Sequence, residues 1–154
     1  MASEATAAEG AIRLKRTFTA SPERVFDAWT NPAKLTKWFG VAAPDQLPTK
    51  IITVDVRVGG RYEVLITSPT GKEYRMRGTY REVRPPEKLV FTWSWEGGDF
   101  QDSVVTIELR RLGQSNFTEL SITHELLPES QREGHTKGWI GCFDTLEAVL
   151  KAEA

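Results

Sequence analysis

The chain has 154 residues, of which 40% are apolar and 27% charged, and its 20 basic and 21 acidic side chains leave a formal net charge of −1. This length is sufficient for one domain without disulfides or a metal, and the balanced charge argues against nucleic-acid binding. Because no stretch approaches the roughly 18 apolar residues of a membrane span and Cys142 is the single cysteine, we expect a cytoplasmic protein with no membrane span.

The first eleven residues are expected to form a disordered N-terminal tail. They lack the basic region and the apolar core of a secretory signal. No repeat, low-complexity linker or change in composition divides the rest of the chain, so we expect a single domain over residues 12–154. At its start, residues 12–19 alternate apolar and polar side chains, which predicts a half-buried strand.

Two short helices are predicted next. In residues 21–29, Ser21 can cap a helix and Pro22 suits its first position, with an apolar stripe behind them. Residues 31–40 repeat the pattern with Asn31 and Pro32, and Gly40 can end the second helix in a left-handed conformation.

From residue 50 to residue 127 the apolar period changes to two. Six strand-like runs follow one another with turn sequences between them, which predicts an antiparallel meander. Residues 135–150 then return to the helical period and predict a long amphipathic helix that packs on the sheet. The predicted order is strand, two helices, six strands and a long helix, an α+β fold.

The last helix carries a stripe of small residues beside its apolar face: Gly134, Gly138, Gly141, Thr145 and Ala148. Each glycine inside a helix costs about 0.5–1 kcal/mol relative to alanine. The stripe therefore indicates that something approaches the helix backbone closely. Packing of the helix on the sheet is one explanation, and a bound ligand is the other.

A curved sheet that wraps a helix leaves a space between them, and large aromatic side chains with polar tips are predicted to face it. Such residues can line a ligand cavity or can simply form the core. The predicted ligand-binding residues are Tyr62, Met76, Tyr80, Trp93, Trp95, Val105, His124, His135, Gly138, Trp139, Gly141 and Cys142.

Several segments resemble one known family. They are "ASPERVFDAWTNPAKLTKWFG" at 20–40, "VGGRYEV" at 58–64, "GTYREVRPPEKLVFTW" at 78–93, "LSITHELLP" at 120–128, and "HTKGW" at 135–139 with Phe143 and Leu146 after it. In order and spacing the chain is similar to the START-like (SRPBCC) helix-grip superfamily, in the group of the C-terminal domain of the activator of the heat-shock protein 90 ATPase.

The resemblance implies a helix-grip fold of about seven strands, in the order β-α-α-β6-α, with an internal cavity between the sheet and the C-terminal helix. Members of the superfamily bind lipids, polyketides and other apolar small molecules, and some are cyclases or hydrolases. The name of the group implies a chaperone as a possible protein partner. Oligomeric state is open between a monomer and a weak homodimer.

Three functional hypotheses follow. The first is a protein that binds a small apolar or amphipathic molecule, such as a lipid, polyketide or aromatic metabolite. The second is a cyclase- or hydrolase-type enzyme with His124 as general base and Tyr80 or His135 polarising a carbonyl; a buried, hydrogen-bonded His124 is the alternative. The third is a protein-interaction module, which requires an exposed apolar patch.

The sequence gives little support for cofactors or metals. Its two histidines lie apart without a CxxC or HExxH pattern, so we expect no metal site and no cofactor. Cys142 has no neighbouring base in the sequence and is expected to be a buried, unreactive thiol.

Overall fold

The computed structural model describes residues 4–8, 11–43, 45–97 and 102–153. They form eight strands and three helices, with the bounds that follow. The strands are β1 (Glu4–Ala8), β2 (Ala11–Phe18), β3 (Lys50–Val54), β4 (Arg61–Thr67), β5 (Glu73–Arg84), β6 (Lys88–Trp95), β7 (Ser103–Arg111) and β8 (Thr118–Glu125), and the helices are α1 (Pro22–Thr30), α2 (Pro32–Trp38) and α3 (Glu129–Ala152).

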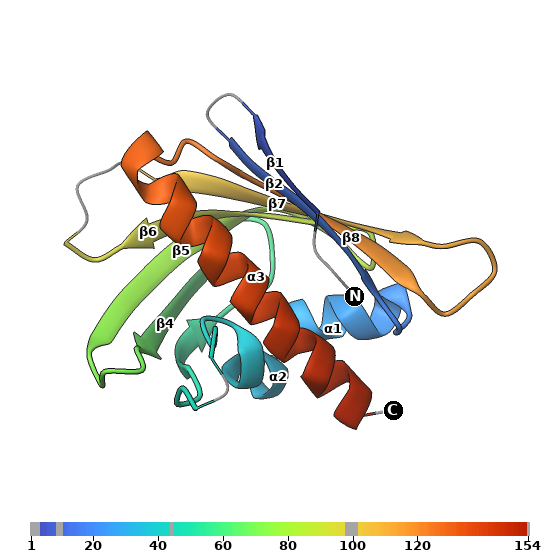
Figure 1. Ribbon diagram of the computed structural model, residues 1–154, viewed down its shortest axis with the longest axis horizontal. Coiled ribbons are helices and arrows are strands. Elements are labelled where there is room, and N and C mark those ends of the chain that lie inside the picture. The colour runs from blue at the N-terminus through green and yellow to red at the C-terminus, as the bar shows by residue number, and fades with distance from the viewer. Residues whose placement is uncertain (1–3, 9–10, 44, 98–101, 154) are drawn as a thin grey trace.

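The strands of the described residues form one antiparallel sheet in the order β1-β2-β8-β7-β6-β5-β4-β3. Figure 1 shows α3 crossing one face of this curved sheet, with α1 and α2 beside the C-terminal half of α3. The predicted α+β helix-grip fold is confirmed, and from β2 onward the elements follow the predicted order of strand, two helices, six strands and long helix; β1 adds an eighth strand to the seven expected.

The tail is where the structure differs from the expectation. Instead of being disordered, Glu4–Ala8 forms β1 and pairs with β2, from Glu4 opposite Lys15 to Ala8 opposite Ala11. Without β1, β2 would be an edge strand with unpaired backbone groups, and an alanine-rich segment can satisfy them through its own backbone. Residues 1–3 and 9–10 of the predicted tail lie outside the described residues.

The predicted helix caps are present. The Ser21 side chain accepts a hydrogen bond from the Arg24 backbone N–H at 3.3 Å, and Asn31 Oδ1 accepts one from Ala33 N–H at 3.0 Å. Each helix then begins at a proline. After α2, Gly40 has a φ of +78°, and a Cβ there would lie 2.6 Å from Ile66 Cδ1, so the turn requires glycine.

Helix α3 begins earlier than predicted, at Glu129 instead of residue 135, so Gly134 lies inside the helix. Pro128 occupies the N-cap position, where its fixed φ suits a helix start. The apolar residues of the C-terminal half of α3, among them Phe143, Leu146 and Leu150, are buried in the core.

An ion-pair cluster around the buried Arg16 also holds this half of α3 on the sheet. Arg16 projects from the inner face of β2 and is only 4% exposed. Its Nη1 lies 2.6 Å from Asp144 Oδ1, and its Nη2 lies 3.4 Å from Glu147 Oε2. From α1, Arg24 Nη2 donates to the Leu150 carbonyl at 2.7 Å. The C-terminal half of α3 is therefore fixed by both apolar and polar contacts.

Candidate ligand-binding cleft

Among the spaces lined by residues of both the sheet and the helices, two of very different size contain predicted site residues. The larger is an open cleft of about 700 Å³ beside the N-terminal half of α3. Its described lining residues are Gly40, Ala42, Ile66, Tyr74, Trp93, Trp95, Glu96, Gly97, Gln131, Gly134, His135, Gly138, Trp139 and Cys142. A volume of this size is typical of small-molecule sites.

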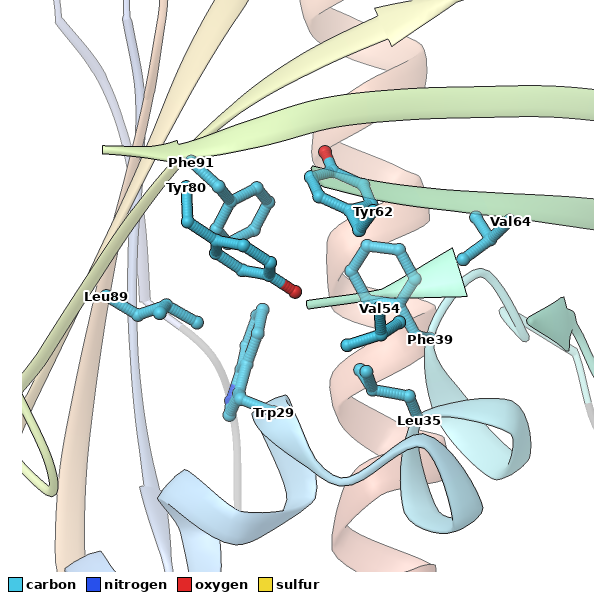
Figure 2. A pocket seen from close by; sticks show the side chains of 9 residues that line it. All are labelled: Trp29, Leu35, Phe39, Val54, Tyr62, Val64, Tyr80, Leu89 and Phe91. Carbon is cyan, nitrogen blue, oxygen red and sulfur yellow. The ribbon is translucent and has the colours of Figure 1, made fainter. Parts of the chain in front are cut away.

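The smaller space is an internal void of about 20 Å³, room for about one water molecule. Figure 2 shows its nine lining side chains turned toward one another, with the Tyr80 hydroxyl pointing in among them. Tyr62 also lines the void, and its hydroxyl donates to the Thr92 carbonyl. The space expected deep between sheet and helix is thus almost filled by aromatic side chains, and the larger space is open to solvent.

The three glycines of α3 play two different roles. A Cβ on Gly141 would lie 2.5 Å from the Ala42 carbonyl oxygen and 2.9 Å from Ala42 Cβ, so this glycine allows a loop to pack on the helix. A Cβ on Gly134 or Gly138 would meet nothing within 4 Å. The small-residue stripe therefore has different surroundings along its length: Gly141 packs against the loop at Ala42 and not against the sheet, while Gly134 and Gly138 border the open cleft.

Aromatic rings from β5, β6 and α3 line the same cleft as Gly134 and Gly138. The Trp93 ring centroid lies 5.0 Å from that of Trp139 and 5.7 Å from that of Trp95. Tyr74 extends the wall from β5, with its ring 6.0 Å from Trp95. Aromatic rings in such edge-to-face and tilted pairs offer a large apolar surface to a ligand.

His124 is fully buried behind this wall and does not line the cleft. Its Nδ1 accepts the Trp139 indole N–H at 3.1 Å, and Nε2 lies 2.8 Å from Ser103 Oγ. Because Nδ1 accepts, the neutral ring carries its proton on Nε2, which donates to Ser103. Burial, together with the nearby His135, lowers the pKa of His124 to about 3.

His135 lines the cleft and is similarly engaged. Its Nε2 accepts the Trp95 indole N–H at 3.0 Å, so Nδ1 carries the proton and donates to the Gln131 carbonyl at 2.8 Å. Burial lowers the pKa of His135 below its usual value, against the smaller opposing effect of that hydrogen bond. Each histidine is therefore a neutral acceptor for one tryptophan.

The described lining of the cleft offers little charge to a ligand. Apart from His135, Tyr74 and Cys142, the one ionisable side chain among these lining residues is Glu96. Its Oε2 lies 3.0 Å from Arg75 Nε. Cys142 is a free, buried thiol, and burial raises its pKa to about 12. Isolated charges are costly to bury, so this lining favours a ligand whose inserted part is uncharged.

The predicted site residues divide between these spaces. The cleft takes the following six of them: Trp93, Trp95, His135, Gly138, Trp139 and Cys142. Tyr62 and Tyr80 line the void instead, and Met76, Val105 and His124 are core residues that line neither space. Gly141 packs against Ala42.

Sequence reasoning missed several cleft residues. Tyr74 lies on the same inward row of β5 as Met76 and Tyr80, so alternation could have identified it. Gly40 and Ala42 come from the loop after α2, and nothing in the sequence signals that this loop reaches α3.

The hypothetical catalytic groups do not surround one space. Tyr80 lines the void, His135 lines the cleft, and His124 lines neither space and is buried with both ring nitrogens hydrogen-bonded. Within the described ranges, no three His, Cys, Asp or Glu side chains gather as a metal site would require. No helix in the same ranges is long and apolar enough to cross a membrane.

Comparison with known proteins identifies the same fold. A family model described as "Activator of Hsp90 ATPase homolog 1-like protein" matches residues 19–151. None of the curated proteins matches the chain significantly. Solved structures match over nearly the whole chain.

The Chromobacterium violaceum protein CV1439 is 30% identical, with a TM-score of 0.81 over 93% of this chain and 98% of its own. An AHSA1 protein from Silicibacter pomeroyi is 26% identical, with a TM-score of 0.78 over 94% and 99%. The Mycobacterium smegmatis protein Ms6760 is 19% identical, has a TM-score of 0.83 over 100% and 99%, and shows the likeness of fold alone.

Proposed function

This chain belongs to the Activator of Hsp90 ATPase homolog 1-like family, and we propose that it binds one small apolar or amphipathic molecule in the cleft beside the N-terminal half of α3. The observation that carries the proposal is the open space above Gly134 and Gly138, which faces the rings of Trp93 and Trp95. Two helix-destabilising glycines are retained where no neighbouring atom requires them. A ligand that lies against the helix backbone accounts for both.

The lining indicates the chemistry of the ligand. Aromatic rings supply most of one wall, and the His135 nitrogens are already hydrogen-bonded within the protein. The inserted part of the ligand is therefore a flat, uncharged group that gains affinity by burying apolar surface. Its polar end lies at the mouth, near Gln131 and Glu96. A cytoplasmic location is part of the same proposal, since the one cysteine is a free thiol.

A fluorescence titration with 2-naphthol as a neutral aromatic probe tests the proposal. We expect saturable binding with a dissociation constant on the order of 0.1 mM, as for other ligands of few atoms. Gly138→Leu places a branched side chain in the cleft and should weaken binding at least about tenfold, the effect of losing roughly 1.4 kcal/mol of contact.

Ala148→Leu is the matched control, because it adds the same side chain to an exposed position of the same helix. It should bind 2-naphthol as the wild type does. Equal affinity of Gly138→Leu and Ala148→Leu would refute the assignment of the cleft, and a wild-type protein that binds no neutral aromatic probe would refute the function.

A further inference from the structure

Phe39 lies at the boundary between the two spaces. It lines the internal void, yet its ring centroid is 5.7 Å from that of Trp93 and 6.2 Å from that of Trp139, both of which line the cleft. The residue after it, Gly40, lines the cleft itself. We propose that Phe39 is the partition that sets how deeply a ligand can enter, which makes it a specificity-determining residue; this inference rests on the proposed function of the cleft.

The sheet places the void and the cleft end to end along the same three strands. Each strand contributes inward residues to both spaces. The void takes Tyr62 and Val64 from β4, Tyr80 from β5, and Leu89 and Phe91 from β6. The cleft takes Ile66 from β4, Tyr74 from β5, and Trp93 and Trp95 from β6. On β6, Phe91 of the void and Trp93 of the cleft are consecutive residues on one face of the strand, where neighbouring residues are about 6.6 Å apart. The wall between the spaces is thus about one side chain thick at this point.

The backbone at Phe39 is fixed by features other than its ring. Phe39 is the C-cap residue of α2, with φ −68° and ψ 118°, and its N–H donates to the Leu35 carbonyl. The Phe39 carbonyl accepts a hydrogen bond from the Thr49 hydroxyl. Gly40 makes the following turn. A smaller side chain at position 39 can therefore remove the ring while these backbone contacts remain.

Trp29 also borders the void, with its ring 5.9 Å from Trp139. It is a less suitable partition, because its ring also packs against Phe143 and so belongs to the core beneath α3. Phe39 is the ring that contacts both Trp93 and Trp139 while it lines the void.

Loss of the Phe39 ring would join the void to the cleft and produce one deep pocket. Figure 2 shows the Tyr80 hydroxyl directed toward the apolar side chains that line the void. The Tyr62 hydroxyl is already bonded to the Thr92 carbonyl. In the wild type, an apolar extension on a ligand would meet the inner wall of the cleft. The joined pocket would have room for that extension. The wild-type protein is therefore selective for short, flat ligands because of Phe39.

The test compares 2-naphthol with 6-hexyl-2-naphthol on four proteins: wild type, Phe39→Ala, Phe39→Leu and Leu35→Ala. Leu35 lines the void but not the cleft, so Leu35→Ala enlarges the void without opening it and serves as the matched control. The quantity compared is the ratio of the two dissociation constants, which cancels general loss of stability. If Phe39→Ala does not fold, the same ratio is measured for Phe39→Leu.

We expect the ratio to shift toward the hexyl compound by at least about tenfold in Phe39→Ala, as burial of two further methylenes would give. Phe39→Leu should shift it in the same direction by less, and Leu35→Ala should keep the wild-type ratio. Amide NMR shifts caused by the hexyl compound should reach Tyr80 and Leu89 in Phe39→Ala, and stop at the cleft in the wild type.

Equal ratios in the wild type, the folded Phe39 variants and Leu35→Ala would overturn the partition and leave the cleft as a binding site. If the wild type bound neither compound, the proposed function would fail. The partition would then stand only if a Phe39 variant bound 6-hexyl-2-naphthol with shifts at Tyr80 and Leu89. Absence of binding to all four proteins would overturn both.

Discussion

The two halves of α3 lie on the same sheet but make very different surfaces. The C-terminal half buries Phe143 and Leu146 completely and is tied to β2 through Arg16. The N-terminal half presents Gly134 and Gly138 to an open cleft. One helix thus anchors the fold with one half and leaves a ligand-sized space with the other.

The difference shows how the cleft can exist without loss of the fold. Most helical stability in proteins comes from packing of an apolar face and not from intrinsic propensity. Because the second half of α3 supplies that packing, the first half can contain glycines and still remain helical. Substitutions in the two halves should therefore differ in the size of their effects and, for the glycines, in sign.

The largest effect is expected for Phe143→Ala in the packed half. The side chain is fully buried against Phe18, Trp29 and Trp139. Its removal should lower the free energy of unfolding by about 3–5 kcal/mol, the usual cost of such a cavity. Urea denaturation measures this, with Gln131→Ala at the exposed edge of the cleft as the control, expected within about 0.5 kcal/mol of the wild type. Similar losses for the two variants would remove the contrast between the halves.

Acid should destabilise the protein through His124, which is fully buried on β8 and hydrogen-bonded to Trp139 of α3. The folded-state pKa is lowered to about 3 from an ordinary 6.5, so the unfolded chain binds a proton that the folded chain excludes. The contribution of neutral His124 to the free energy of unfolding is therefore fully present above pH 6.5. It is lost as the pH drops toward 3, by about 1.4 kcal/mol per pH unit.

Between pH 6.5 and pH 5 this amounts to about 2 kcal/mol, and His124→Gln should lose that part of the pH dependence. Urea denaturation at several pH values, compared between the wild type and the variant, isolates it from other groups. Parallel pH profiles for the two proteins would contradict the neutral, hydrogen-bonded state of His124.

Gly141→Ala tests the packing at the junction between the two halves of α3. The new methyl group would meet the Ala42 backbone at 2.5 Å, and backbone atoms cannot move away cheaply. After allowance for the better helix propensity of alanine, we expect a net loss of about 1–2 kcal/mol. An increase in the melting temperature would show that the loop at Ala42 does not pack on the helix as described.

Gly134→Ala and Gly138→Ala should have the smallest effects, and in the opposite direction. Nothing lies within 4 Å of either added methyl group, so each variant should gain about 0.5–1 kcal/mol from helix propensity. Thermal denaturation of the two variants beside Gly141→Ala provides the measurement. Destabilisation by all three substitutions would mean that the N-terminal half of α3 is packed like the rest.

Much of the fold was predictable because its signals are local. Ser21 and Asn31 indicated two capped helices, and the alternation around His124 correctly placed that side chain on the inner face of β8. The strand over Glu4–Ala8 was not predictable, because an alanine-rich segment has no side-chain pattern and forms a strand only when a sheet edge is available.

The site was predictable only in part. The stripe on α3 indicated a close approach, but which glycine meets the Ala42 loop depends on tertiary packing. Likewise, the inward rows of β4 and β5 were expected to line one cavity. The filling of that space by Phe39 and Trp29, which leaves only a small void, depends on how α1 and α2 dock. Sequence periodicity identifies the inward face and does not identify which part of it stays open.

An amide NMR titration of the labelled protein with 2-naphthol tests the central claim most directly. If the N-terminal half of α3 is the ligand site, saturable shifts should appear at Gly134, Gly138 and the indole N–H of Trp95, while Leu146 and Leu150 remain unmoved. Shifts that gather around Leu146 and Leu150, or none at the two glycines at saturating probe, would contradict it.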